Sequence, residues 1–471
     1  TKRIIFHHVV VNKNRQQGCF GLLKVRRNCV ENVEVMIFEE LATIIKSKKG
    51  DIIMSFNPFE QKPENIEKLF CDWKTMYPQS YSKNDVSPFT KLRCILTNGA
   101  EYEAVWFSHQ FFRHCTNNDL RRELALIRKS EQAQQKIGAC LKPKDETVLE
   151  TTIGYEQLAV ELTAMLAMRE PDKRVKAALD FALLEDFDHL YRYADLLDME
   201  HGVHAENLVG ELTEIMPARP TITHHRYPKD EVKKPVDFKK ASPVTKLDVA
   251  IITAAEQQTM NYYMNQCGFY ETDLGRRLYQ EIAMVEEQHV SQYGSLMDVK
   301  QSWLEGWLCH EYTECYVYYS CFKDETDKHV KKIWEMCLLQ EITHLHKACE
   351  CLEKYGKKNW QEVIPDGNFP ELLAFKSTKN YVRDVIANTV CNTAHREGYV
   401  SINDLDDNAE FFTYQKIVNA NEKMTPSHSV IDAHIDKEGK DYRYENSPSP
   451  VESLRSRTKD NTTLGRVKNC K

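Results

Sequence analysis

Acidic residues recur along the chain in one fixed register, and this register constrains the fold more than any other feature. Four times, a Glu is followed 30 positions later by a second acid. Within each half of the chain the two pairs start 55 residues apart, and the halves are offset by 155 residues. The pairs are Glu101 with Glu131, Glu156 with Asp186, Glu256 with Glu286, and Glu311 with Glu341. One structural unit is therefore expected four times.

The midpoint of every pair predicts a turn between two helices. Turn-forming and helix-capping residues occupy all four midpoints, at 116–119, 170–172, 272–273 and 326–327. In an antiparallel hairpin, residues equally far from the turn lie at the same level. We therefore expect four helical hairpins, each bringing its two acids level with each other.

A second repeat marks where the halves begin. Ser87-Pro88 recurs as Ser242-Pro243, and a Ser cap followed by Pro is a typical start of a helix. The expected fold is all-α, with two tandem four-helix bundles joined by a Pro-rich linker. The predicted parts are an N-terminal segment at 54–86, bundle 1 at 87–200, the linker at 201–242, bundle 2 at 243–356, and a C-terminal helix with a flexible tail at 357–471.

Residues 1–53 differ from the rest and are interpreted as a translated leader. Lys48-Lys49-Gly50-Asp51 can be encoded by a purine-rich stretch resembling a bacterial ribosome-binding site, three codons before Met54. A small N-terminal appendage is the alternative.

Two Glu-x-x-His motifs indicate metal ligands in bundle 2. His289 follows Glu286 by three residues, and His344 follows Glu341 in the same way. Side chains at i and i+3 share one helix face, so each acid and imidazole point the same way. With a Glu from each opening helix, the set matches that of di-iron and di-manganese carboxylate bundles. The predicted metal ligands are Glu256, Glu286, His289, Glu311, Glu314, Glu341 and His344.

The chemistry explains the residue types. Buried carboxylates are costly without a cation, and two divalent ions would neutralise four of them. Ligands rich in oxygen and poor in nitrogen suit iron or manganese better than zinc or copper. The expected cofactor is two Fe ions, with Mn as the alternative.

Bundle 2 resembles the ferritin-like superfamily and, within it, the rubrerythrins. The resemblance rests on Glu311-Tyr312-Thr313-Glu314, because rubrerythrins have an extra Glu three residues after the third-helix ligand. It implies that Glu314 and His289 exchange as ligands of one iron when the redox state changes. It also implies a di-iron oxidoreductase, of peroxidase or oxidase type, that reduces hydrogen peroxide or oxygen. The CxxC pairs of a rubredoxin domain are absent, so an external rubredoxin-like or flavoprotein-like electron donor is expected.

Bundle 1 has a degraded version of the set, because Gln134 stands where a His is expected and Asp186 is one methylene shorter than Glu. A second metal site is an alternative to a retained scaffold, in which the fused bundles mimic a dimer. The chain would then be a monomeric pseudo-dimer or a homodimer. The altered set is Glu101, Glu131, Gln134, Glu156, Asp186 and His189.

Composition excludes other classes of function. The net charge of −7 comes without a basic stripe, which argues against nucleic-acid binding. No uninterrupted apolar run reaches the length of a membrane span, about 18 residues. The 15 cysteines are scattered, as is typical of reduced thiols in a cytoplasmic protein. The alternatives left open are a di-manganese catalase and a non-catalytic iron-binding or scaffold protein.

Overall fold

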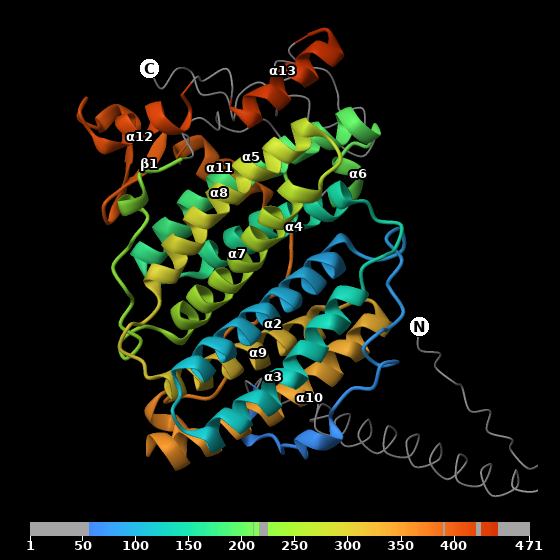
Figure 1. Ribbon diagram of the computed structural model, residues 1–471, viewed down its shortest axis with the longest axis vertical. Helices are drawn as coiled ribbons and strands as arrows, with labels where there is room; N and C mark the ends of the chain where they lie inside the picture. Colours follow the sequence, from blue (N-terminus) through green and yellow to red (C-terminus); the bar gives the residue numbers. More distant parts are fainter. Residues whose placement is uncertain (1–55, 211, 216–224, 390, 421–424, 441–471) are drawn as a thin grey trace, which may run out of the picture. The chain divides into compact units, whose positions relative to one another are not determined.

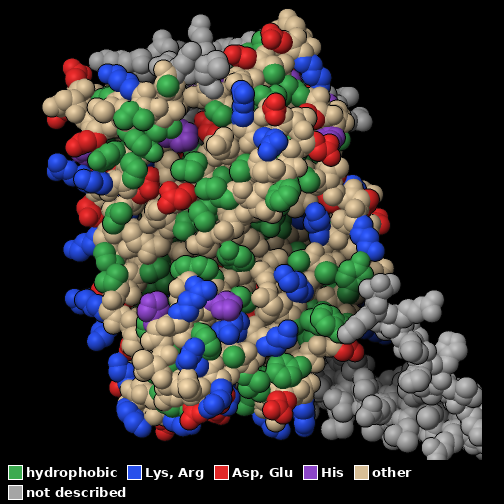
Figure 2. Space-filling view, in the orientation of Figure 1, with side chains coloured by type: hydrophobic (Ala, Val, Ile, Leu, Met, Phe, Trp, Pro, Cys, Tyr) green, Lys and Arg blue, Asp and Glu red, His purple; other side chains and the backbone are tan. Residues whose placement is uncertain are grey.

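The computed structural model of the chain describes residues 56–210, 212–215, 225–389, 391–420 and 425–440 (Figure 1). The described part is mostly helical, with a single short β-hairpin, as expected for an all-α protein. The leader interpretation of residues 1–53 falls outside the described residues. No described helix combines the length and the apolar character that a bilayer span requires. On the face shown in Figure 2, Lys and Arg side chains are interspersed with Asp and Glu.

Eight helices of more than twenty residues dominate the described structure, and they form the four expected hairpins. One residue of each predicted turn caps the second helix of its hairpin with its side chain, and these are Asn117, Asp172, Thr272 and Asp327. Ser87 and Ser242 cap the helices that open the two halves, each with Pro at the first position. The hairpins are α2 (Pro88–His114) with α3 (Asn118–Cys140), α4 (Val148–Arg169) with α5 (Lys173–His201), α7 (Pro243–Phe269) with α8 (Asp273–Leu296), and α9 (Trp303–Asp324) with α10 (Lys328–Cys351).

The hairpins pair across the two halves of the chain, which corrects the predicted tandem bundles. The α2/α3 hairpin packs against α9/α10 to form bundle A, and α4/α5 packs against α7/α8 to form bundle B (Figure 1). Neither 87–200 nor 243–356 is therefore a bundle of its own. Each half contributes one hairpin to each bundle, and the bundles meet mainly where α2 crosses α7.

Equivalent contacts in bundles A and B show that the two bundles are related by the 155-residue repeat of the sequence. The Thr90 hydroxyl donates to Glu325 in bundle A, at 2.8 Å. The Thr245 hydroxyl donates to Glu170 in bundle B, at 2.5 Å, and both members of this pair are offset by 155 residues from the first pair. Thr90 lies near the start of α2 and Glu325 at the end of α9, so the opening helices of one bundle run antiparallel.

This antiparallel arrangement explains the exchange. The end of α3 lies beside the start of α2. The helix that pairs with α2 in the same bundle, α9, begins at the opposite end of that bundle. A helix of 23 residues, the length of α3, is about 35 Å long at about 1.5 Å per residue. The connection 141–147 to α4 spans at most about 24 Å even when fully extended. It cannot run the length of the bundle, so the next hairpin enters the neighbouring one.

The segment between the halves is packed against the helices. It contains the short helix α6 (Glu206–Val209) and a 3₁₀ turn at Pro228–Asp230. The side chains of Arg226, Val236 and Phe238 are buried. The described part of the linker therefore packs against both bundles, with Val209 and Ile215 in the core of bundle B and Val236 and Phe238 in the cluster that includes bundle A.

The terminal segments also fold. Before α2, the 3₁₀ turns Pro58–Glu60 and Ile66–Lys68 pack on α10. After α10 come a π-helical turn at Leu352–Gly356 and a 3₁₀ turn at Trp360–Glu362. The later elements are α11 (Lys379–Thr389), the antiparallel strands β1 (Asn392–His395) and β2 (Gly398–Ser401), a 3₁₀ turn at Ile402–Asp404, α12 (Glu410–Val418) and α13 (Pro426–Glu438).

The prediction of a single C-terminal helix followed by a flexible tail was wrong for the described part of 357–471. Helix α13 packs on α5 and α8 of bundle B. Its apolar residues Val430 and Ile431 are buried, which a solvated tail would not allow. Residues 441–471 lie outside the description.

Candidate metal centres

Site B, at the centre of bundle B, combines an acid from each of four helices with two imidazoles. Helices α4 and α7 each contribute a Glu, and α5 and α8 each contribute an acid with a His three residues later. The i, i+3 spacing places each acid and His on one helix face. At most 1% of any of these side chains is exposed. The six residues are Glu156, Asp186, His189, Glu256, Glu286 and His289.

The ligand atoms of site B form two groups that share one carboxylate. In each group the atoms lie within 4.8 Å of one another. Glu286 belongs to both groups, so the two groups could hold two cations that share this carboxylate. One group consists of Asp186, Glu256, Glu286 and His289, and the other of Glu156, His189 and Glu286.

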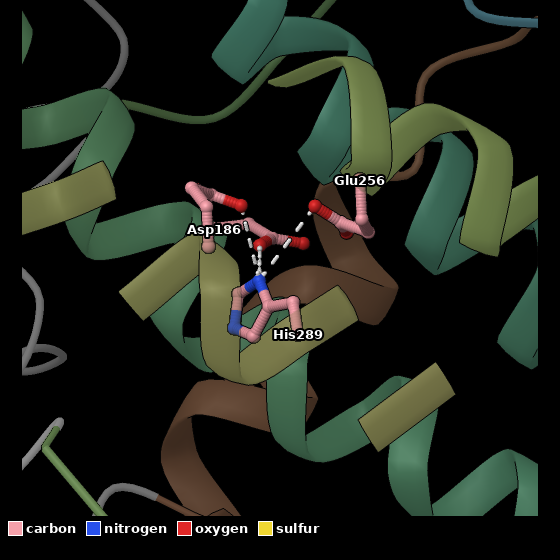
Figure 3. A group of neighbouring side chains, drawn as sticks. Asp186, Glu256 and His289 are labelled. Carbon is pink, nitrogen blue, oxygen red and sulfur yellow. Dashed lines mark ion pairs between the residues drawn. The ribbon is translucent and has the colours of Figure 1, made fainter. Parts of the chain in front are cut away.

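Three carboxylates face one nitrogen of His289. Its Nδ1 lies 3.4 Å from Asp186 Oδ1, 3.7 Å from Glu256 Oε2 and 3.3 Å from an oxygen of Glu286. In Figure 3, Asp186 and Glu256 approach this nitrogen from different helices. On the other side of the site, His189 Nδ1 lies 2.8 Å from Glu286 Oε1.

The orientation of His289 is fixed at its other ring nitrogen by residues that the Glu-x-x-His motif does not contain. Its Nε2 lies 2.8 Å from Glu185 Oε2. Glu185 also pairs with the buried guanidinium of Arg226, which the linker supplies. A carboxylate on the outer nitrogen of a ligating His fixes the ring and makes it a better ligand. Glu185 directly precedes Asp186 in the sequence, but nothing local marks Arg226 as its partner.

The electrostatics of site B are those of a buried acidic cluster. Burial and the neighbouring carboxylates hold the pKa values of Glu156 and Glu256 well above the usual range. Burial raises the pKa of Asp186 to about 7. Burial also acts to raise the pKa of Glu286, but the hydrogen bond with His189 and the nearby His289 ring outweigh burial and lower that pKa.

The donor set fits a metal because its buried oxygens have no other partner. Within the described structure, Glu156 Oε2, Asp186 Oδ1, Glu286 Oε2 and both carboxylate oxygens of Glu256 accept no hydrogen bond. Burying such atoms unpaired is costly. A divalent cation would satisfy them and balance their charge.

Site A, at the centre of bundle A, has more carboxylates and fewer imidazoles. At most 1% of any of its side chains is exposed. The ligand atoms again form two groups within 4.8 Å, and Glu311 belongs to both. The residues of site A are Glu101, Glu131, Gln134, Glu311, Glu314, Glu341 and His344.

Gln134 gives site A its distinct chemistry. Its amide donates a hydrogen bond to Glu341 Oε1, which uses an oxygen that a metal would otherwise take. His344 lies on the other side, with Nδ1 3.2 Å from Glu341 Oε2. Glu314 adds a carboxylate with no counterpart in site B, and neither of its oxygens has a hydrogen-bond partner in the described structure.

Protonation in site A follows the same physical causes. Burial, reinforced by neighbouring carboxylates, holds the pKa values of Glu101, Glu311 and Glu314 well above the usual range. Burial raises the pKa of Glu131 to about 7. Burial opposes the charge on His344, but the Glu341 carboxylate outweighs it and raises the pKa of the ring.

A tyrosine approaches an equivalent Glu in each site. The Tyr263 hydroxyl donates to Glu156 at 2.6 Å, and the Tyr318 hydroxyl donates to Glu101 at 2.5 Å. Each tyrosine lies seven residues after a predicted ligand, Glu256 or Glu311, and thus on the same helix face two turns later. A Tyr seven residues after a predicted ligand is therefore the sequence signal for this contact.

The structure divides the seven predicted ligands between the two sites. Three of them belong to site B, and Glu311, Glu314, Glu341 and His344 belong to site A. The altered set of bundle 1 divides in the same way, with three members in each site. The predicted exchange between Glu314 and His289 was therefore wrong, because these residues lie in different bundles. The physical reason is the exchange of hairpins, which keeps each local motif and changes its partner.

Comparison with known proteins gives no relative. No family model matches the chain, and neither a curated protein nor a solved structure matches it significantly.

Proposed function

We propose that the chain is a di-iron oxidoreductase of the rubrerythrin-like, ferritin-like kind, with its complete dinuclear centre at site B. One observation carries the proposal. Six buried side chains converge there, one acid from each of the four helices plus two imidazoles, and a cation would satisfy the oxygens that accept no hydrogen bond. Iron or manganese is the metal that such an oxygen-rich set suits best.

The proposed reaction is reduction of hydrogen peroxide or of oxygen. With peroxide, two ferrous ions would supply two electrons and, with two protons, the products are two waters and two ferric ions. The residues of the chain hold, orient and enclose the centre. His189 and His289 would each face one metal position, and Glu286 would lie between them. Glu185 and Arg226 would hold the His289 ring in place.

Helix packing around site B would exclude bulk water from the reaction. The acids on all four helices are buried, and the tyrosine layer of Tyr193, Tyr263 and Tyr279 closes one side. The Tyr263 hydroxyl holds Glu156 through its Oε1 and leaves Oε2 for a metal. Electrons would come from an external donor protein, of rubredoxin-like or flavoprotein-like type.

The test is metal content per chain, measured by plasma mass spectrometry on protein purified without air. Wild type is compared with Glu286→Ala, which removes the shared ligand of site B, and with Glu341→Ala as the matched change in site A. Iron that is lost in Glu286→Ala and kept in Glu341→Ala supports the proposal. Metal that is unaffected by Glu286→Ala would overturn it.

Peroxide consumption then separates the alternatives. Consumption that requires a reductant supports the oxidoreductase. Two manganese ions with consumption in the absence of a reductant would instead identify a catalase. Bound iron with neither activity would leave an iron-binding protein.

A further inference from the structure

A cavity of about 540 Å³ lies beside site A, between helices α2, α7 and α9. His310 is part of its wall, and the Nε2 of this ring lies 4.0 Å from Glu314 Oε2. A single imidazole thus separates the cavity from a candidate ligand of site A. The large apolar side chains of the wall are Phe107, Phe238, Leu247, Met297, Trp303 and Ile364.

The cavity is larger than oxygen or peroxide requires. A water molecule occupies about 30 Å³ of liquid, and peroxide is only slightly larger. Pockets for small organic molecules typically measure about 300–1,000 Å³, with mostly apolar walls and a few polar groups. Both the volume and the lining of this cavity therefore match an organic molecule.

The apolar wall is ordered by ring contacts. Phe107 stacks on His310 with ring centres 5.6 Å apart, and it also contacts Trp303 at 5.5 Å. Gly306 makes room for this arrangement, because a Cβ there would come within 3.3 Å of the Phe107 ring. These contacts hold the aromatic rings of the wall against one another.

Two lysines line the cavity, and Lys246 is the one that is partly buried, whereas Lys239 is exposed. Lys246 lies on the first turns of α7, and within the described structure no ion pair or hydrogen bond ends on its Nζ. The neighbouring acids accept hydrogen bonds from backbone N–H groups, and the charge of Asp298 also acts on Lys246. Asp298 accepts from the backbone N–H of Phe238 and of Lys300, at 3.1 and 2.8 Å, and Asp366 accepts from Asn368.

We propose that this cavity binds a small organic acid, with its apolar body against the aromatic wall and its carboxylate on the Lys246 ammonium. Partial burial of the pair would strengthen the interaction, because less water screens the charges there than on an open surface. Among the acids that line the cavity, Glu103 differs from Asp298 and Asp366, because its Oε2 accepts no hydrogen bond in the described structure. If the cavity instead prefers cationic ligands, the charged head group of the ligand would pair with Glu103.

The experiment is titration calorimetry on the metal-free protein with octanoate, octan-1-ol and octylamine. These probes share the apolar chain and differ in the head group. We expect octanoate to bind most tightly, and Lys246→Met to weaken it at least tenfold while leaving octan-1-ol unchanged. Lys246→Arg should retain binding. Lys239→Met, at an exposed lysine on the rim, is the control.

The competing outcomes are distinct. Equal binding of octanoate and octan-1-ol would overturn the role of Lys246, and tighter binding of octylamine would overturn the sign of the charge. Absence of binding by all three probes would overturn the site itself. Ala250→Trp, which places a bulky side chain in the cavity, should abolish binding if the site is correctly located.

The proposal does not depend on metal at either site, and the measurements keep the two apart. Metal content of Lys246→Met should equal that of wild type, because Lys246 contacts no candidate ligand. Octanoate binding by a protein that takes up no metal would support the cavity and contradict the proposed function. Metal uptake without octanoate binding would do the reverse.

Discussion

Bundles A and B are built from equivalent hairpins, yet their centres differ in the number of imidazoles. Site B has one His on each of its second helices, His189 and His289. Site A has His344 on one, and Gln134 at the corresponding position of the other. Site A also has Glu314, which has no equivalent in site B. The scaffold is therefore common to both bundles, and the Gln134 amide and the additional Glu314 carboxylate make site A unlike site B.

The comparison shows what a helical register can and cannot conserve. The four carboxylates recur in both sites because every hairpin brings two acids level. An amide is a poorer ligand than an imidazole, and the amide of Gln134 is already bonded to Glu341. We therefore expect site B to bind two metal ions and site A to bind one ion more tightly than a second.

The largest expected effect comes from Glu286→Ala, which should remove both ions from site B and leave site A unchanged. Glu286 is the carboxylate common to both ligand groups, so each ion loses a ligand. Metal analysis after dialysis against a chelator measures the result. Loss of only one ion would contradict the bridging position.

Gln134→His should make site A resemble site B. An imidazole would replace the amide that now bonds Glu341, and the stoichiometry at site A should rise by one ion per chain. The matched variant His289→Gln should lower site B by one ion. Anaerobic titration with ferrous iron measures both changes, and an unchanged stoichiometry in Gln134→His would show that Glu314 already completes site A.

Metal-free protein should become less stable as pH rises from 5 to 8. Burial raises the pKa values of Asp186 and Glu131 to about 7, so at these pH values the folded state binds more protons than the unfolded state, and stability falls with increasing pH. One pKa unit corresponds to about 1.4 kcal/mol, so the free energy of unfolding should fall measurably over this pH range.

Denaturant unfolding at a series of pH values measures this fall. Metal should reverse the trend, because a cation replaces the protons. The double variant Asp186→Asn/Glu131→Gln should flatten the profile, and an unchanged slope would assign it to other groups.

Glu185→Gln should weaken metal binding at site B about 10- to 100-fold, the usual effect of altering the partner of a ligating His. The change leaves the size of the side chain intact but removes the charge that orients His289. Competition with a chromophoric chelator gives the affinities. Site A serves as the internal control, and equal weakening at both sites would indicate a general loss of structure.

The smallest effect is expected from the tyrosines. Tyr263→Phe removes one hydrogen bond to Glu156, and Tyr318→Phe removes the equivalent bond to Glu101. A hydrogen bond to a charged group contributes about 1.5–3 kcal/mol, but the freed oxygen would gain contact with a metal. Each change should therefore alter affinity only at its own site, and by less than tenfold. Chelator competition on the paired variants checks this.

Much of the local structure followed from the sequence. The four hairpins, their capping residues and the face that carries each acid and His follow from spacing and turn chemistry, and the structure confirms these elements. The ligand set did not follow, because any two hairpins in this register present four acids at one level. Glu131 fits opposite Glu311 as readily as opposite Glu156 when only spacing is considered.

The length of the connections held more information than the motifs. The connection 141–147 is too short to run along a bundle whose opening helices are antiparallel. That argument needs the direction of the partner helix, which no local pattern supplies. The role of Arg226 was likewise out of reach, because its partner Glu185 lies 41 residues away on another element.

The sequence by itself thus determined the hairpins and the register of their acids. The helix caps and turns depend on neighbouring residues, and the equal distance of two acids from their turn follows from counting along the chain. Only the tertiary structure decided which hairpins share a centre. That choice depends on contacts between distant segments, such as buried Arg93 with Glu325 in bundle A and Arg169 with Asp248 in bundle B. These ion pairs stabilise only the packed structure, because the two charged groups of each pair come together only when the hairpins pack.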